Sequence, residues 1–216
     1  MTRLINIRGT ALPLPIENLD TDQIMPKQFL RITDKTGLAK GFLHDLRFDA
    51  YGMPRGDSIL NSEAYANARI LIGGSNFGCG SSREHAVWGM QQYGFQAVIA
   101  PSFAEIFYSN AMNNRLLLVQ LDREEICELT QFVLQNPSSE LQIDLLLQTV
   151  RTSARRSFSY EIDARHKQMV VEGLDAIDLT LGLAAQISEF EAQHHKRYPW
   201  ARVLSQRVLA HETSRD

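Results

Sequence analysis

The 216-residue sequence has few cysteines and no long apolar run. Its two cysteines, Cys79 and Cys127, form no CxxC pair and are too few for a cluster site built from several thiols, so any iron–sulfur cluster must come from another chain. No stretch approaches the roughly 18 consecutive apolar residues of a membrane helix, and residues 1–8 lack an apolar signal core. These absences predict a soluble, cytoplasmic protein that does not associate with a membrane.

The sequence also lacks a charge excess of either sign. It has 22 basic and 25 acidic residues and a net charge of −3, which gives no electrostatic footprint for nucleic acid. His194 and His195 are adjacent, so their side chains point apart on a helix, and no carboxylate or cysteine is spaced to complete a metal site. We therefore expect neither a bound metal nor a nucleic-acid partner.

Residues 70–86 are the most informative stretch of the chain. A short apolar run at 70–72 precedes a loop with four glycines in eight residues, which permits positive φ angles and leaves backbone amides free for an anion. Ser81 and Glu84 are spaced as the capping box of a following helix. Because Arg83 lies between them, hydroxyl, amides, helix N-terminus and guanidinium can converge on one carboxylate or phosphate.

Familiar nucleotide and hydrolase motifs do not fit this loop. A dinucleotide fingerprint beginning at Gly78 requires glycine where Arg83 stands, and a P-loop beginning at Gly73 requires lysine where Cys79 stands. A nucleophile elbow beginning at Gly80 requires glycine at position 84, where the chain has glutamate. The residues alone therefore predict an anion-binding loop and leave its chemistry open.

The rest of the chain predicts an α/β fold. Apolar runs alternate with helical patterns, which indicates parallel strand pairing, at residues 70–72, 96–100 and 115–121. Residues 4–16 contain prolines and predict strands near a sheet edge. Asp122 and Glu125 are spaced as a capping box for a helix to about Gln135, with Cys127 in the core. Alternating strands follow at 141–163.

The string from Gly78 to Ala86, Gly-Cys-Gly-Ser-Ser-Arg-Glu-His-Ala, resembles the signature of the swivel domain of the aconitase superfamily. Within it, the string is most similar to the family of 3-isopropylmalate dehydratase small subunits. A second signature of that family, Asp-Thr-Asp-Gln-Ile-x-Pro, stands at 20–26, and the span 97–107 with the following Asn113-Asn114 also matches. Relatives usually have proline where Leu118 stands, which we interpret as a change in strand geometry.

The resemblance implies a three-layer β/β/α swivelling domain with a parallel or mixed sheet over residues 1–201, followed by a C-terminal tail at 202–216. A helix from about 179 to 195 would end the domain. Residues 28–57 are weakly periodic and dotted with glycine, and we expect a mobile loop with short helical turns that closes on the substrate. Three basic residues in this loop can either bind a distal carboxylate of the substrate or be ordinary solvated charges: Arg31, Lys35 and Lys40.

The resemblance further implies a hydro-lyase subunit that binds no cofactor itself and is active only with a large subunit carrying a 4Fe-4S cluster. The implied reaction isomerises 2-isopropylmalate to 3-isopropylmalate through 2-isopropylmaleate, in leucine biosynthesis. Ser81 is the expected catalytic base, because loop amides and a helix N-terminus stabilise its alkoxide. Ser82 and Arg83 are expected to bind a carboxylate of the small dicarboxylic hydroxy-acid substrate.

Other residues of the two signatures are expected to line or orient the cleft: Asp20, Thr21, Asp22, Gly78, Cys79, Gly80 and His85. Two acids as close as Asp20 and Asp22 can share a proton or position an arginine. Three alternatives stay open at this point. They are a related hydro-lyase acting on citraconate or 2-methylmalate, an RNA-binding regulator, and a stand-alone anion-binding module.

Overall fold

The computed structural model describes residues 3–31 and 36–201. The chain divides into two compact units, Met1–Asp175 and Ala176–Asp216, which we describe separately. The predicted tail at 202–216 lies outside the described residues, so the domain boundary at 201 stays a prediction.

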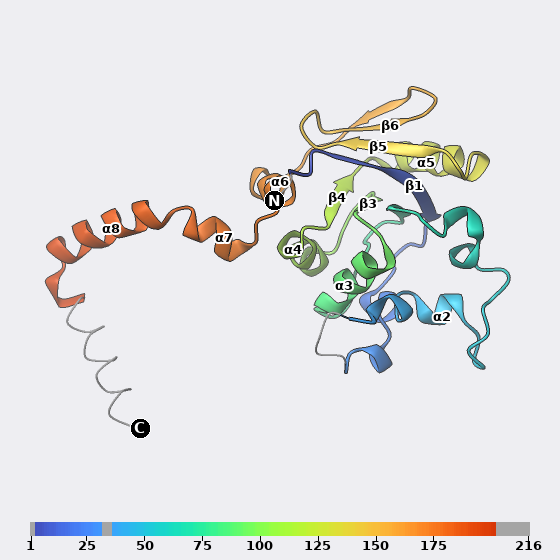
Figure 1. Ribbon diagram of the computed structural model, residues 1–216, viewed down its shortest axis with the longest axis horizontal. Coiled ribbons are helices and arrows are strands. Elements are labelled where there is room, and N and C mark those ends of the chain that lie inside the picture. The colour runs from blue at the N-terminus through green and yellow to red at the C-terminus, as the bar shows by residue number, and fades with distance from the viewer. Residues whose placement is uncertain (1–2, 32–35, 202–216) are drawn as a thin grey trace. The chain divides into compact units, whose positions relative to one another are not determined.

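The first unit is built on a mixed seven-stranded sheet of order β4-β3-β2-β1-β5-β6-β7 (Figure 1). The strands are β1 Asn6–Leu14, β2 Ile70–Gly73, β3 Ala97–Ala100, β4 Leu117–Gln120, β5 Glu140–Asp144, β6 Thr149–Thr152 and β7 Ser157–Ser159. β1 to β4 are parallel to one another, whereas β5, β6 and β7 continue the sheet antiparallel. The predicted α/β class with a mixed sheet is confirmed.

β1 joins the two halves of the sheet. Its first part pairs antiparallel with β5 from Asn6 to Thr10, and its second part pairs parallel with β2 from Ala11 to Leu14. The predicted edge position is wrong, since β1 is the central strand. Pro13 fits because β5 pairs with β1 only from Asn6 to Thr10. Beyond Thr10, that side of β1 has no registered strand partner, so the missing N–H of proline costs no ladder bond.

Four helices lie in the connections between the parallel strands: α1 Thr21–Ile24, α2 His44–Arg47, α3 Glu84–Tyr93 and α4 Glu105–Asn113. α5 Arg123–Gln135 connects β4 to the antiparallel β5, and α6 Ala164–Glu172 follows β7. α3 packs against α4, and α5 packs against β1. The predicted capping box of α5 is confirmed, with the backbone N of Asp122 donating to Glu125 Oε2 at 3.0 Å. The predicted core position of Cys127 is wrong, because this residue of α5 is exposed.

The expected loop at 28–57 contains the predicted short helical turns: the 3₁₀ turns Lys27–Phe29 and Leu38–Lys40, and α2. Part of it is firmly packed. Leu38 and Phe42 are fully buried, and the Phe42 ring contacts the rings of Tyr93 and Phe95 at centroid distances of 4.9 and 5.4 Å. The backbone N of Leu38 also donates to Gln92 Oε1 at 2.9 Å. The middle of the segment is thus anchored on α3, and its mobility stays a prediction.

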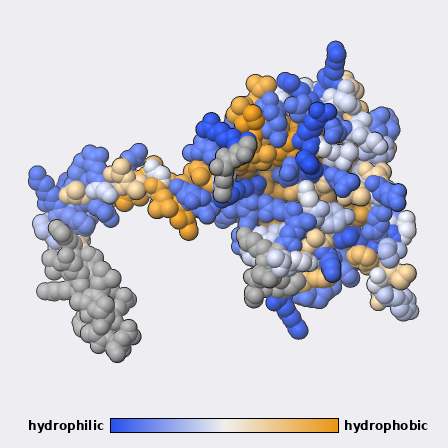
Figure 2. All heavy atoms as spheres, viewed as in Figure 1, coloured by the Kyte–Doolittle hydropathy of each residue, from blue (hydrophilic) through white to orange (hydrophobic). Residues whose placement is uncertain are grey.

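The second unit contains α7 (Ala176–Leu181) and α8 (Ala184–Arg197). The single helix predicted here is wrong, because the chain breaks at Gly182, a residue that is unfavourable inside a helix. Neither helix has a buried residue. Figure 2 shows apolar side chains at the surface of α7, where Ile177 and Leu181 are 69% and 66% exposed.

His166 of α6 predicts a pH-dependent stability. Its side chain is fully buried, its Nδ1 lies 3.3 Å from the Tyr108 hydroxyl of α4, and burial lowers the pKa of His166 below 6.5 despite the nearby Asp163 carboxylate. The unfolded chain therefore binds this proton more readily than the folded chain, so stability falls as pH drops below about 6.5, by at most about 1.4 kcal/mol per pH unit. Urea unfolding should be measured at pH 7.5 and 5.5. Between these two pH values, the free energy of unfolding should change less in His166→Gln than in the wild type, and equal changes in both proteins would contradict this assignment.

Candidate active site

The two signature segments, 60 residues apart in sequence, lie side by side in the structure. The backbone N of Gly78 donates to Leu19 O, and the backbone N of Thr21 donates to Cys79 O, each at 2.8 Å. The Cys79 thiol adds a bond to the carbonyl of Asn18 at 3.2 Å. The glycine loop is therefore fixed by the backbone of the segment that precedes and begins α1.

Thr21 also links the two segments through its side chain. Its hydroxyl donates to the carbonyl oxygen of Ser81 at 2.8 Å. Gly80, at φ +95°, has no Cβ, and a Cβ there would lie 3.3 Å from Thr21 Oγ1. Ser81 and Ser82 themselves are exposed. The loop thus holds its backbone against Thr21 and presents two serine side chains to solvent.

Arg83 and Asp22 form an ion pair between Nη1 and Oδ1 across the two segments. The arginine side chain is 12% exposed and the aspartate side chain 44% exposed. Asp20 acts differently, since its Oδ1 accepts from the backbone N of Gln23 at 2.7 Å and so caps α1. The two acids do not act as one pair, and Asp22 is the one that positions the arginine.

The predicted capping box of Ser81 and Glu84 is wrong. α3 begins only at Glu84, and its N-cap residue, Arg83, makes no side-chain capping bond. Instead, Glu84 Oε1 accepts from Asn114 Nδ2 at 2.6 Å, so this carboxylate bonds to the end of α4. Ser81 therefore precedes α3 and is not its cap. In the first turn of α3, the His85 ring packs on Trp88 at a centroid distance of 4.8 Å.

Gly78 cannot accept a side chain, which gives a stability prediction. Its φ is +76°, and a Cβ would lie 2.2 Å from Phe107 Cγ in α4. Gly78→Ala should lower the free energy of unfolding by about 3 kcal/mol, measured by urea denaturation, since left-handed backbone and overpacking each cost about 1 kcal/mol or more. Gly56→Ala is the control, because a methyl group at that position would have no atom within 4 Å. Similar losses in both variants would refute the steric argument.

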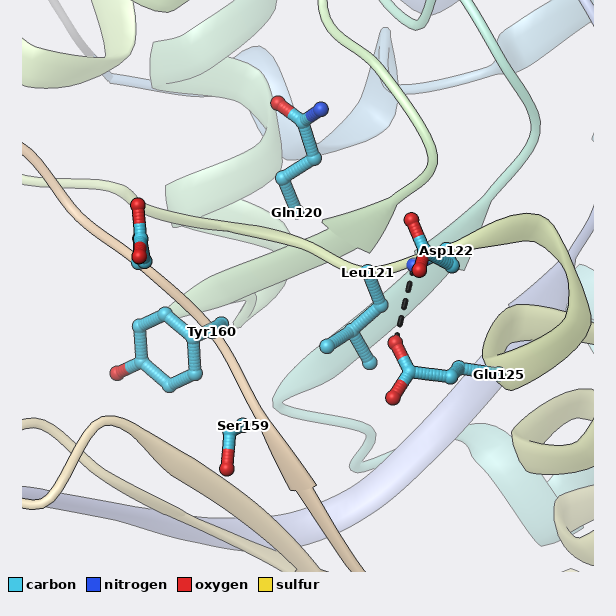
Figure 3. Close-up of a pocket in the computed structure, with 7 residues that line it drawn as sticks. Gln120, Leu121, Asp122, Glu125, Ser159 and Tyr160 are labelled. Carbon is cyan, nitrogen blue, oxygen red and sulfur yellow. Dashed lines mark hydrogen bonds between the residues drawn. The ribbon is translucent and has the colours of Figure 1, made fainter.

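A pocket of about 540 Å³ lies elsewhere in the first unit, between the end of β4, the start of α5 and the chain after β7 (Figure 3). Three of its polar residues have roles in the fold. Asp122 and Glu125 are bonded to each other as the cap of α5. Burial, with a smaller contribution from Asp144, raises the pKa of Tyr160, whose hydroxyl donates to Asp144 O at 3.4 Å. None of the predicted site residues lines this pocket.

The structure offers no metal site in the part of the chain that it describes, where no group of three His, Cys, Asp or Glu side chains is arranged to hold an ion. Within residues 3–31 and 36–201 there is also no helix both long and apolar enough to cross a membrane. Of the candidates for a distal carboxylate, Arg31 and Lys40 are exposed, and Lys35 lies outside the described residues.

Comparison with known proteins identifies this architecture. Residues 1–124 match the family model of the aconitase C-terminal domain, which is the class defined by the mixed sheet and the glycine loop. Residues 177–201 match a second model, the C-terminal domain of the 3-isopropylmalate dehydratase small subunit. The chain belongs to the family of 3-isopropylmalate dehydratase small subunits, which confirms the resemblance seen in its sequence.

Individual relatives agree with this assignment. The chain is 54% identical over 205 residues to the 3-isopropylmalate dehydratase small subunit 1 of Chromobacterium violaceum, covering 95% of this chain and 96% of the relative. It is 45% identical to a small subunit from Roseiflexus castenholzii, covering 88% and 94%. A crystal structure of 3-isopropylmalate dehydratase from Methanocaldococcus jannaschii superposes with a TM-score of 0.63 at 27% identity, covering 85% of this chain and 99% of that one.

Proposed function

We propose that this chain is the small subunit of a hydro-lyase that isomerises 2-isopropylmalate to 3-isopropylmalate through 2-isopropylmaleate, in leucine biosynthesis. The observation that carries the proposal is the meeting of the two signature segments, in which Asp22 pairs with Arg83 and Thr21 bonds to Ser81. This arrangement provides a hydroxyl and a guanidinium on one loop. The hydroxyl can remove a proton from a carbon next to a carboxylate, and the guanidinium can bind that carboxylate.

Ser81 is proposed as the catalytic base. A serine hydroxyl is a poor base unless its alkoxide is stabilised, and preorganised backbone amides supply such stabilisation. The bond from Thr21 to the Ser81 carbonyl fixes the backbone that carries the hydroxyl. Ser81 lies three residues before the start of α3 at Glu84. The amide of Gly78 already donates to Leu19 O, so the stabilising donors are proposed to be amides nearer to Ser81, between the glycine loop and the start of α3.

Arg83 and Ser82 are proposed to bind a substrate carboxylate. A guanidinium has five N–H donors in a planar fork, so pairing with Asp22 at Nη1 leaves others for the substrate. Asp22 also holds the guanidinium in place before the substrate arrives. Gly78, Cys79, Gly80 and His85 are proposed to shape the cleft around these groups.

The partner is proposed to be a large subunit that carries a 4Fe-4S cluster, whose iron supplies a Lewis acid for the substrate hydroxyl. Among the described residues of this chain, no group of three His, Cys, Asp or Glu side chains is arranged to hold a metal ion. This chain's proposed share of the reaction is to move the proton and to bind the carboxylate.

The test is to co-express the chain with the large-subunit candidate encoded beside it, purify the complex without oxygen, and assay 2-isopropylmalate turnover. Activity that requires both chains would support the proposal. Turnover of only citraconate or 2-methylmalate would keep the chemistry and replace the substrate. If no complex forms, tight carboxylate binding or salt-dependent RNA binding by the chain alone would favour the binding-module alternatives.

A further inference from the structure

Asn114, at the C-terminal end of α4, makes several hydrogen bonds near the candidate site. Its Nδ2 donates to Glu84 Oε1 at 2.6 Å and to the carbonyl of Asn110 at 2.9 Å. Its Oδ1 accepts from Trp88 Nε1 at 2.8 Å, and its backbone O accepts from Gln91 Nε2 at 2.6 Å. One asparagine thus bonds to three side chains of α3.

The three partners share one face of α3, because Glu84, Trp88 and Gln91 are spaced at helical i, i+4 and i+7 positions. They span the helix from its first residue to its last turn. Glu84 is the residue directly after Arg83, the proposed carboxylate ligand. Contacts to Asn114 therefore fix the start of α3, directly after Arg83, whose guanidinium is also held by Asp22.

The bond to Glu84 anchors the first turn of α3, which has no side-chain cap of its own. Helix ends without side-chain caps fray, since their first amides lack intrahelical partners. The N-cap residue of α3 makes no side-chain capping bond, and the glutamate that could form a capping box is bonded to Asn114 instead. A short bond from an amide to a carboxylate is among the stronger hydrogen bonds in proteins.

We propose that Asn114 and Glu84 are a positioning pair for the dehydratase reaction: their bond holds the first turn of α3 and, through it, the guanidinium of Arg83 toward the substrate carboxylate. Neither residue is assigned contact with substrate. The expected effect on KM rests on the proposed function. The expected effect on the first turn of α3 rests on the hydrogen-bond geometry alone.

The test uses a charge change and its compensation in the reconstituted two-subunit enzyme. Asn114→Asp places a second carboxylate against Glu84, so the KM for 2-isopropylmalate should rise about tenfold while kcat changes much less. Glu84→Gln keeps an acceptor and should change KM less than about threefold. In the double variant, the new glutamine can donate to the new aspartate, so KM should return toward the wild-type value.

Val150→Ala is the matched control for stability, because Val150 is fully buried in β6. It should lower the Tm without raising KM. An unchanged KM in Asn114→Asp, or a double variant no better than the single one, would overturn the proposal.

A second readout does not depend on activity. Hydrogen exchange of the isolated chain should be faster at the amides of Ala86 to Trp88 in Asn114→Asp and restored in the double variant. Unchanged exchange there would refute the positioning pair. If the wild-type complex fails to turn over 2-isopropylmalate, the proposed function fails, and this exchange experiment still decides the pair.

Discussion

Replacement of Ser81 by alanine is expected to lower the kcat of the reconstituted enzyme about a thousandfold, which lies within the range for loss of a general base. Ser81 is exposed, and its link to Thr21 runs through its backbone carbonyl, which alanine retains. The free energy of unfolding should therefore change by less than about 0.5 kcal/mol. The measurement is steady-state turnover of 2-isopropylmalate with the large subunit in excess.

Ser82→Ala is the matched control, because it removes the neighbouring exposed hydroxyl. If Ser82 only helps to bind the carboxylate, its loss should raise KM and leave kcat nearly unchanged. A Ser81→Ala enzyme with a kcat within about tenfold of the wild type would remove Ser81 from the role of base. Equal kcat losses in both variants would show that neither hydroxyl has a separate role.

Replacement of Arg83 by lysine is expected to lower kcat/KM about a hundredfold. A lysine can still pair with Asp22 as a point charge, but it cannot make the paired, planar hydrogen bonds of a guanidinium to a carboxylate. Loss of such charged bonds costs about 3 kcal/mol, which corresponds to roughly a hundredfold. The fold should be retained, so circular dichroism and complex formation with the large subunit should match the wild type.

Arg123→Lys provides the comparison for this substitution. Arg123 is 72% exposed and pairs with Glu17 at 3.6 Å, and exposed pairs of this kind contribute little. Its replacement should leave kcat/KM unchanged within about twofold. Full activity of Arg83→Lys would withdraw the arginine from substrate binding, and a loss in both variants would indicate a general need for arginine charge.

Much of the fold could be predicted because its signals are local. The apolar runs that became β2, β3 and β4 lie between turn and helix residues, and such runs become buried parallel strands. The cap of α5 depends on two residues of one turn, Asp122 and Glu125. Gly94 ends α3 at φ +122°, a conformation that glycine adopts readily.

The wrong predictions depend on contacts between residues that lie far apart in the sequence. In one case such a contact takes the place of a local hydrogen bond. Glu84 does not cap α3 with Ser81, because Asn114 binds its carboxylate across the helix pair. Pro13 suggested an edge strand, and only the length of β5 shows why proline fits in the central one. Cys127 followed a helical pattern whose buried face could not be placed without knowing which side of α5 meets β1.

The resemblance predicted that the two signature segments belong to one site, but the pairings within it could not be predicted. The residues alone indicated an anion-binding loop, and the resemblance added the segment at 20–22. That Asp22 pairs with Arg83 while Asp20 caps α1 depends on side-chain directions that spacing does not set. The catalytic and binding roles of Ser81, Ser82 and Arg83 stay predictions for the experiments above.

The position of β1 also affects how the protein folds as it is synthesised. All strands of the parallel half have left the ribosome once Gln120 has emerged, whereas β5, the other neighbour of β1, ends only at Asp144. Domains generally fold as units, and all seven strands belong to the unit Met1–Asp175. The central strand is therefore among the first parts of this unit to be synthesised, yet it gains its antiparallel neighbour only after the whole parallel half has been made.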